Sequence, residues 1–148
     1  MDAIQLLIDD HNAVKEKFAQ FEHIDNLNNA DEKITLSHEI CAALATHMAI
    51  EEELFYPAAR ALFDDKDDEL VDDAVKEHKH ARSLMKDIQT LEVGVRLNLE
   101  MKALKLMIED HVKDEEGTMF PKLRQLGMET TQLGEKMAQR KKELSPNM

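Results

Sequence analysis

Two short segments decide the fold of this sequence, His47-Met-Ala-Ile-Glu51-Glu52 and His111-Val-Lys-Asp-Glu115-Glu116. Each places a histidine four residues before a glutamate, and in each a proline, Pro57 or Pro121, follows ten residues after the histidine. Residues four apart lie one turn apart on the same face of an α-helix. Each segment therefore predicts a helix that presents an imidazole and a carboxylate side by side.

The two halves of the sequence also match before these segments, where each has an acidic residue followed directly by a histidine. Asp10-His11 is followed by Lys15, and Glu77-His78 by Arg82, with the basic residue four positions after the histidine in both cases. Two matched pairs in the same order predict two similar helical hairpins that face each other across a pseudo-twofold axis. Counted from the loops at about 1.5 Å per residue, all four histidines fall at one depth of the resulting bundle.

The spacing of apolar residues predicts an all-α fold. Amphipathic helices are expected at residues 2–24, 30–63, 69–92 and 95–116. Short polar loops between them imply an up-down-up-down antiparallel four-helix bundle over about residues 2–122. A weaker C-terminal helix is expected at about residues 130–144, with a lysine-rich end that frays. We expect one domain over residues 1–148.

Particular residues predict where these helices begin and end. Asp2 is expected to cap the first helix, and an aspartate at 67–68 the third. Pro57 is expected to kink the second helix or end its first segment, because proline lacks the N–H that an α-helix needs. Gly117 and Pro121 are expected to end the fourth helix.

Composition and charge narrow the classes of function. The 148 residues carry a net charge of −12 and are 43% apolar, enough for a core. So acidic a chain repels nucleic acid and anionic membranes, and we expect neither as a partner. Cys41, the only cysteine, excludes an intramolecular disulfide, fits a reducing compartment and is expected in the core. The N-terminus lacks the basic start of a secretory signal, and no apolar run is long enough to span a membrane, so we expect a cytoplasmic protein.

The predicted layer of histidines requires a counter-charge. Its six inward side chains are His11, His47, Glu51, His78, His111 and Glu115. Unpaired buried carboxylates are costly, whereas two divalent or trivalent cations stabilise deprotonated glutamate and neutral histidine. A plain ion-pair network is the alternative, but no inward lysine or arginine stands at this level. Shared carboxylates and several imidazoles predict two iron ions, with manganese as the alternative, and suit zinc less well.

The remaining histidines and glutamates near these motifs are expected to play lesser parts. By helical rotation, His38 and His80 face away from the layer, and His23 lies well along the axis from it. We therefore expect all three at the surface. Glu52 and Glu116, one residue past the inward glutamates, are expected beside the site or in solvent rather than on the metal.

The ordered set of histidines and glutamates closely resembles the hemerythrin-like (HHE cation-binding) family, over about residues 2–122. The resemblance implies an up-down four-helix bundle around a non-heme di-iron site. It also implies the ligands: His11 and His47 would bind one iron, His78 and His111 the other, and Glu51 and Glu115 would bridge the two irons, which an oxo or hydroxo group would join.

The sequence departs from the oxygen-carrying members of that family. Those members have a fifth histidine, from an H-x-x-x-H pair on the third helix, and an aspartate five residues after the last histidine. Here Ala74 and Arg82 flank His78 at four residues on either side, and Glu116 takes the place of the aspartate. With two histidines per iron, both irons could be open to water or small molecules.

Three functions follow as candidates. The first is binding of O2, NO or peroxide at the di-iron centre for storage, delivery or sensing. The second is an enzyme that reduces peroxide or O2 in a catalase-like or oxidase reaction, and the third is iron handling with the metal as cargo. No redox partner is identified. The sequence contains no nucleophile–base pair, phosphate loop or dinucleotide fingerprint, so any catalysis must come from the metal.

Overall fold

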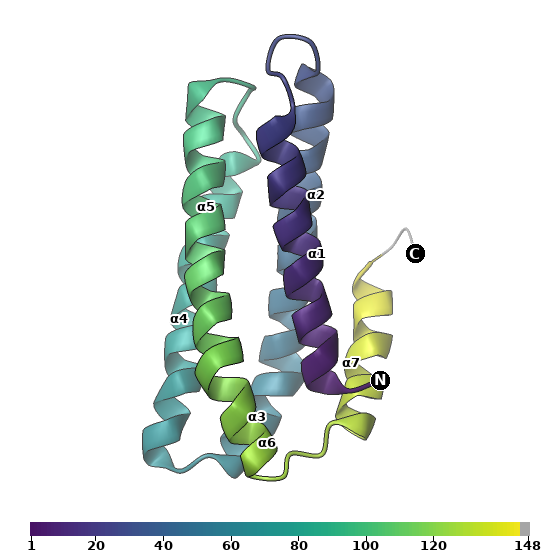
Figure 1. Ribbon diagram of the computed structural model, residues 1–148, viewed down its shortest axis with the longest axis vertical. Coiled ribbons are helices and arrows are strands. Elements are labelled where there is room, and N and C mark those ends of the chain that lie inside the picture. Colours follow the sequence, from purple (N-terminus) through teal and green to yellow (C-terminus); the bar gives the residue numbers. More distant parts are fainter. Residues whose placement is uncertain (146–148) are drawn as a thin grey trace.

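The computed structural model describes residues 1–145 and confirms an all-α bundle. Four long helical rods run antiparallel in up-down-up-down order, and a shorter helix lies against one side of them (Figure 1). The rods are α1 (Ala3–His23); α2 with η1 and α3 (Ala30–Ile50, Glu51–Phe55 and Tyr56–Leu62); α4 (Asp65–Ile88); and α5 with η2 and α6 (Val95–Asp114, Glu115–Met119 and Phe120–Gln125). The shorter helix is α7 (Thr131–Leu144). Within the described residues, no helix is long and apolar enough to cross a membrane.

Aspartate side chains begin two of the rods. Asp2 accepts a hydrogen bond from the Gln5 N–H at 2.9 Å, which confirms the predicted cap. The third rod begins earlier than predicted because Asp64, rather than Asp67 or Asp68, caps it and accepts from the Asp67 N–H at 2.8 Å. Both caps give a partner to a backbone N–H that has none inside its helix.

The helical rods continue through both prolines, so the prediction that Gly117 and Pro121 end the fourth helix is wrong. A five-residue π-helix, η1 or η2, joins each long α-helix to a short one, and the backbone stays helical throughout. Pro57 and Pro121 each follow as the second residue of the short α-helix. Proline is tolerated there because the first N–H groups of a helix need no partner within it. Gly117 lies inside η2 rather than at a helix end.

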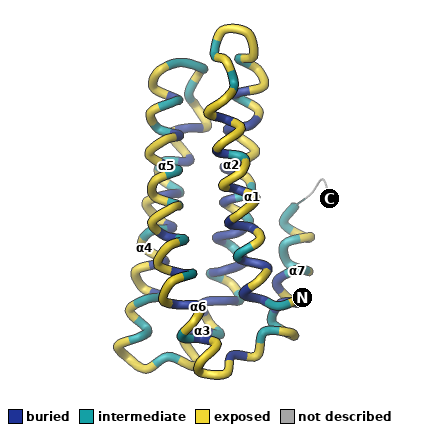
Figure 2. Tube along the Cα trace, in the orientation of Figure 1, coloured by how far each residue is buried: buried dark blue, intermediate teal, exposed yellow. Residues whose placement is uncertain are grey.

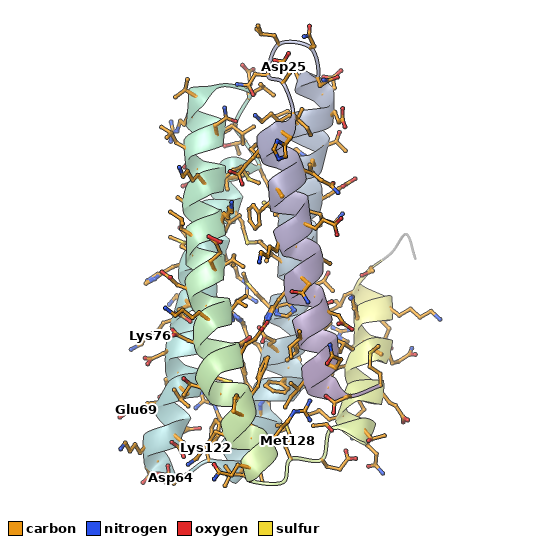
Figure 3. The ribbon with its side chains drawn as sticks, in the orientation of Figure 1. Asp25, Asp64, Glu69, Lys76, Lys122 and Met128 are labelled. Atoms are coloured by element: carbon orange, nitrogen blue, oxygen red, sulfur yellow. The ribbon has the colours of Figure 1, made fainter. Side chains whose placement is uncertain are left out.

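Two apolar clusters fill the bundle, one on each side of a layer of buried polar residues. The lower cluster includes Ile4, Phe55 and Met128 and lies towards α3, α6 and α7 (Figure 3). The upper cluster includes Ile40 and Met101 and lies towards the loops that join α1 to α2 and α4 to α5. Buried positions recur along the rods (Figure 2). Packing above and below therefore holds the rods at a fixed register where the polar layer lies.

Helix α7 packs on α1 and α2 (Figure 1). The Ala3 N–H donates to the Thr130 carbonyl at 2.9 Å, and Met137 is fully buried in the lower cluster. Lys141 donates to Asp10 Oδ1 at 2.5 Å. The lysine-rich end predicted to fray is therefore anchored, with α7 intact to Leu144.

Candidate metal centre

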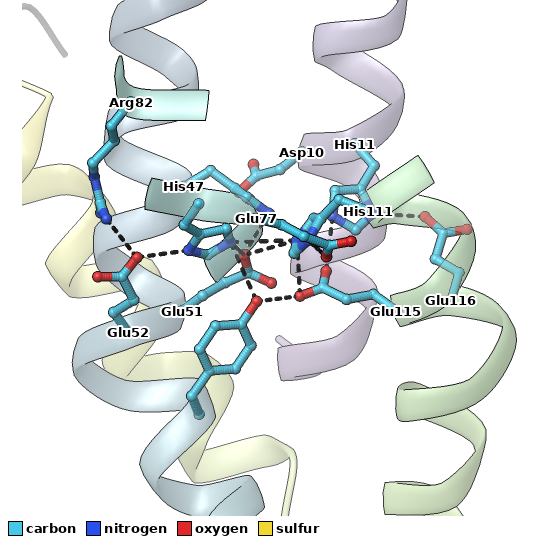
Figure 4. Close-up of polar contacts among 12 residues, drawn as sticks. Asp10, His11, His47, Glu51, Glu52, Glu77, Arg82, His111, Glu115 and Glu116 are labelled. Atoms are coloured by element: carbon cyan, nitrogen blue, oxygen red, sulfur yellow. Dashed lines mark hydrogen bonds and ion pairs between the residues drawn. The ribbon is translucent and has the colours of Figure 1, made fainter. Parts of the chain in front are cut away.

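Each rod contributes one histidine to the polar layer. All of the side chains that the sequence predicts for this layer are buried, at 7% exposure or less, and the structure brings them together (Figure 4). They are His11 from α1, His47 from α2, His78 from α4 and His111 from α5, with Glu51 and Glu115 at the starts of η1 and η2.

Glu51 lies within reach of histidines from both hairpins. Its Oε1 is 3.0 Å from His78 Nε2, 3.3 Å from His47 Nε2 and 3.7 Å from His111 Nε2. The Nε2 atoms of three rings therefore point towards one carboxylate, and that carboxylate spans the two halves of the bundle.

Glu115 repeats this arrangement from the opposite hairpin. Its Oε1 lies 3.3 Å from His11 Nε2, and its Oε2 lies 3.1 Å from His111 Nε2. The histidine rings stand in two pairs, His11 with His47 and His78 with His111, with ring centroids 4.8 Å apart in each pair. Both carboxylates thus lie between two pairs of imidazoles.

A carboxylate accepts a hydrogen bond from the outer nitrogen, Nδ1, of each of the four histidines in the polar layer. The N–O distances are 2.7 Å for His11 to Glu116, 2.9 Å for His47 to Asp10, 2.6 Å for His78 to Glu52 and 2.8 Å for His111 to Glu77. A proton held on Nδ1 leaves the Nε2 lone pair directed into the layer. These bonds therefore set each ring in the tautomer that can bind a metal.

The sequence analysis placed Glu52 and Glu116 beside the site but missed Asp10 and Glu77. A signal was present, because an acidic residue directly precedes the first histidine in each half. Neighbouring positions on a helix point about 100° apart, so such an acid cannot bond its own neighbour. Asp10 instead reaches His47 on the next helix.

The carboxylates hold an extra proton on His47 and on His111 when no cation is present. Burial lowers the pKa of His47, but Glu51 and Asp10 outweigh burial and raise that pKa to about 10. The pKa of His111 is raised well above 6.5, because Glu115 likewise outweighs burial. Burial raises the pKa of Glu51, yet the histidines around it lower that pKa well below 4.5. A metal ion would replace the protons on these rings.

Several atoms at the centre lack a hydrogen-bond partner among residues 1–145. They are the Nε2 atoms of His11 and His47, both carboxylate oxygens of Glu51 and Oε1 of Glu115. Two overlapping sets of four ligand atoms each lie within 4.8 Å of one another: His11, His47, Glu51 and Glu115, and Glu51, His78, His111 and Glu115. Buried polar atoms normally have partners, and a cation in each set would supply them. The residues therefore fit two metal ions that share both carboxylates.

Comparison with known proteins agrees with this geometry. The family described as "Hemerythrin HHE cation binding domain" matches residues 2–142. The chain belongs to this family. Its fold is similar to that of a hemerythrin HHE cation-binding domain-containing protein from Mycobacterium kansasii, at 24% sequence identity and a TM-score of 0.83, covering 99% of this chain and 89% of that one. No protein with a curated description matches the sequence.

One residue distinguishes the two halves of this hemerythrin-type centre. The Tyr56 hydroxyl donates to Glu115 Oε2 at 2.5 Å and lies 3.3 Å from His78 Nε2. Burial and the nearby glutamates raise the pKa of Tyr56 well above 10, so its hydroxyl is a neutral donor. The equivalent residue of the second half is Phe120, whose ring stacks on His11 at 6.2 Å between centroids. The His78 side of the centre therefore has a hydroxyl that the His11 side lacks.

Three hollows reach the hemerythrin-type centre, and one of them is a groove of about 300 Å³ that His11 and Glu116 line. A cavity of about 10 Å³ lies against all four histidine rings, and its other walls are mainly Val14, Leu44, Met48, Ile108 and Val112. No glutamate of the layer lines it, so it lies on the far side of the rings from Glu51 and Glu115. A groove of about 370 Å³ between α1, α2 and α7 approaches His47 and Asp10 from outside.

The other residues noted in the sequence stand away from the centre. His23, His38 and His80 are exposed, as predicted. Cys41 is fully buried, and burial raises the pKa of its thiol to about 11. A thiol of this kind is a structural side chain rather than a reactive one.

Proposed function

We propose that this protein is a non-heme di-iron protein of the hemerythrin type. In this proposal one iron is bound by His11 and His47 and the other by His78 and His111, while Glu51 and Glu115 are shared. The supporting observation is the pair of overlapping sets of four buried ligand atoms. Imidazoles with shared carboxylates suit iron, or manganese, better than zinc, whose structural sites usually contain cysteine.

The proposed function is binding of O2, or a related diatomic such as NO, for storage, delivery or sensing. Bound iron would supply Lewis acidity and one-electron redox chemistry. The chain's own residues set the surroundings: apolar side chains exclude bulk water, and the outer carboxylates keep each Nε2 directed inward. A cavity of about 10 Å³ against the rings has room for about one water-sized molecule, which favours a very small ligand.

Two measurements on the purified protein test this proposal. Metal analysis should find two irons per chain, and the reduced, oxygen-free protein should gain a visible absorption band with O2 and lose it under vacuum. His78→Ala should lose iron and the band, whereas His80→Ala, an exposed histidine on the same helix, should keep both. Folded protein that binds one metal ion or none, with no affinity for a second, would refute the proposal.

Tyr56 favours a second candidate, an enzyme that reduces peroxide in a catalase-like reaction, with a second peroxide oxidised to O2, or that reduces O2 as an oxidase with electrons from an oxidisable substrate. The buried hydroxyl of Tyr56 donates to Glu115 Oε2, with 2.5 Å between the two oxygens, beside one of the two proposed metal positions. Reduction of oxygen species consumes protons, and a donor at this point could supply one without opening the bundle. Oxygen evolution from added peroxide, strongly reduced in Tyr56→Phe protein that keeps its iron, would support an enzyme. An unchanged rate of oxygen evolution in the Tyr56→Phe variant would show that Tyr56 supplies no proton to such a reaction.

A further inference from the structure

Helix α5 exposes a stripe of apolar side chains on its outer face. Leu99 is 63% exposed, Leu106 53% and Met107 40%, and Ala103 between them is also exposed. Helices α1 and α4 contact the inner side of α5, and α7 packs on α1 and α2 instead (Figure 1). A contiguous exposed patch of this kind usually marks an interaction surface.

The other exposed large apolar residues do not form such a stripe. Met1, Leu27, Leu62 and Leu126 stand singly at the N-terminus, in loops or at helix ends, and Val75 stands singly on α4. Val95, 74% exposed at the start of α5, is the exception, because it lies one turn before Leu99 and belongs to the stripe. Single exposed apolar residues are ordinary on protein surfaces and need no partner. The α5 stripe therefore differs from the rest of the exposed apolar surface that the structure describes.

Apart from Val95 and from Leu106, which would face Glu100 of a second copy, residues on this face stand in matched positions on either side of Ala103. Leu99 and Met107 each lie four residues from Ala103, and Arg96 and Asp110 each lie seven residues from it. At about 100° per residue, all five point within an arc of about 80° on one face of the helix. The two ends carry opposite charge, so the face is complementary to itself when one copy is turned end to end.

We propose that a second copy of this chain docks on α5, with a twofold axis passing by Ala103. In the resulting antiparallel helix pair, Leu99 of each copy opposes Met107 of the other, and Arg96 opposes Asp110. The small side chain of Ala103 at the crossing point allows the helix axes to approach to about 8 Å. An isologous contact of this type closes after two copies, so it forms a dimer rather than a fibre.

The charged ends are available for this contact. Arg96 is exposed, and its only ion pair within residues 1–145 is a 3.5 Å contact with Glu100 on the same helix. Asp110 is exposed and has no ion pair within those residues. Each dimer would contain two Arg96–Asp110 pairs, one at each end of the apolar seam, and these pairs would select the antiparallel orientation.

One helix pair buries less area than a standard stable interface of about 1,600 Å², so the dimer should be weak and should exchange with the monomer. Sedimentation velocity of the metal-loaded, full-length protein from about 10 µM to 1 mM should show concentration-dependent dimerisation. A monomer at every concentration would overturn the proposal.

Charge reversal tests which face is used. Arg96→Glu and Asp110→Arg should each weaken dimerisation at least about tenfold, because each puts two like-charged pairs into the contact. The double variant should restore it, and an equimolar mixture of the two single variants should form the heterodimer. Lys136→Glu, the same charge change at an exposed position of α7, is the control and should dimerise like the parent chain.

Circular dichroism and metal content of each variant verify that the fold is intact, which matters for Asp110 because it precedes His111. Dimerisation unaffected by Arg96→Glu would place the contact on another face. A folded double variant that stays monomeric would show that the proposed pairing is wrong. Either result would overturn the inference.

Discussion

Loading the metal-free protein with Fe²⁺ at pH 7 is expected to release about two protons per chain. Glu51 and Asp10, against the effect of burial, raise the pKa of His47 to about 10, and the pKa of His111 is also raised well above 6.5. Both rings therefore carry an extra proton at pH 7 when no metal is bound. Each must lose it before Nε2 can bind a cation.

The same protons set opposite pH trends for metal affinity and for the stability of the metal-free protein. Apparent affinity should rise by up to about tenfold per pH unit for each proton displaced, as pH rises from 6 to 8. A raised pKa stabilises the folded state fully below the unfolded value of 6.5, and this contribution is lost as pH rises towards about 10. The metal-free protein should thus become less stable over the range in which metal binding becomes tighter.

Calorimetric titration in buffers of different protonation enthalpy counts the released protons directly. Asp10→Asn removes one of the charges that raise the pKa of His47, so it should reduce the number released. His80→Ala, at an exposed position, is the matched control and should leave the count unchanged. Tight binding of two metal ions with no proton release, and with affinity constant from pH 6 to 8, would show that this account of the site's charges is wrong.

Three further substitutions test separate contacts. Tyr56→Phe should lower the free energy of unfolding of the metal-free protein by about 1.5–3 kcal/mol in urea titrations, because Glu115 loses a buried donor. Gly134→Ala should detach α7 and abolish its protection from hydrogen exchange, because a Cβ there would meet the backbone of the N-terminus, 2.8 Å from the nitrogen of Ala3. Asp2→Ala should cost about 1 kcal/mol at pH 7 in thermal or urea unfolding. Hydrogen bonds to Asp2, chiefly from Arg124, outweigh burial and lower its pKa from 3.8 to about 2, so this contribution should be lost as pH falls through about 2.

Most of the bundle could be predicted from the sequence because helix faces repeat with a short, regular period. The apolar spacing and the paired histidines place four rods and one polar layer without reference to distant contacts. The course of the chain through Pro57 could not be predicted in this way, since a π-helix has no composition of its own. The docking of α7 was also hidden, because it depends on the missing side chain of Gly134 against the N-terminal backbone.

At the centre, the sequence predicted the six converging side chains, and their role as metal ligands stays a prediction. The helical repeat of His47 and Glu51 identifies side chains on one face of one helix. Asp10 and Tyr56 escaped notice because their partners lie on other helices. Contacts of that kind depend on how each rod is rotated about its axis and on how far it is shifted along the bundle relative to its neighbours. No pattern within a single helix encodes either quantity.

The two π-helices also determine which side chains of the α2 and α5 rods face inward below the metal layer. A π turn accommodates one residue more than an α turn, so each of these rods carries an insertion immediately below the metal layer. Deleting one residue from η1 would restore α geometry and leave the rod below nearly in phase, because the wide turn had absorbed the extra residue. A deletion from a neighbouring α turn, which absorbs no extra residue, would instead rotate everything below it, Tyr56 included, by about 100°. Whether a change of chain length disturbs the metal layer therefore depends on whether it falls within the π turn.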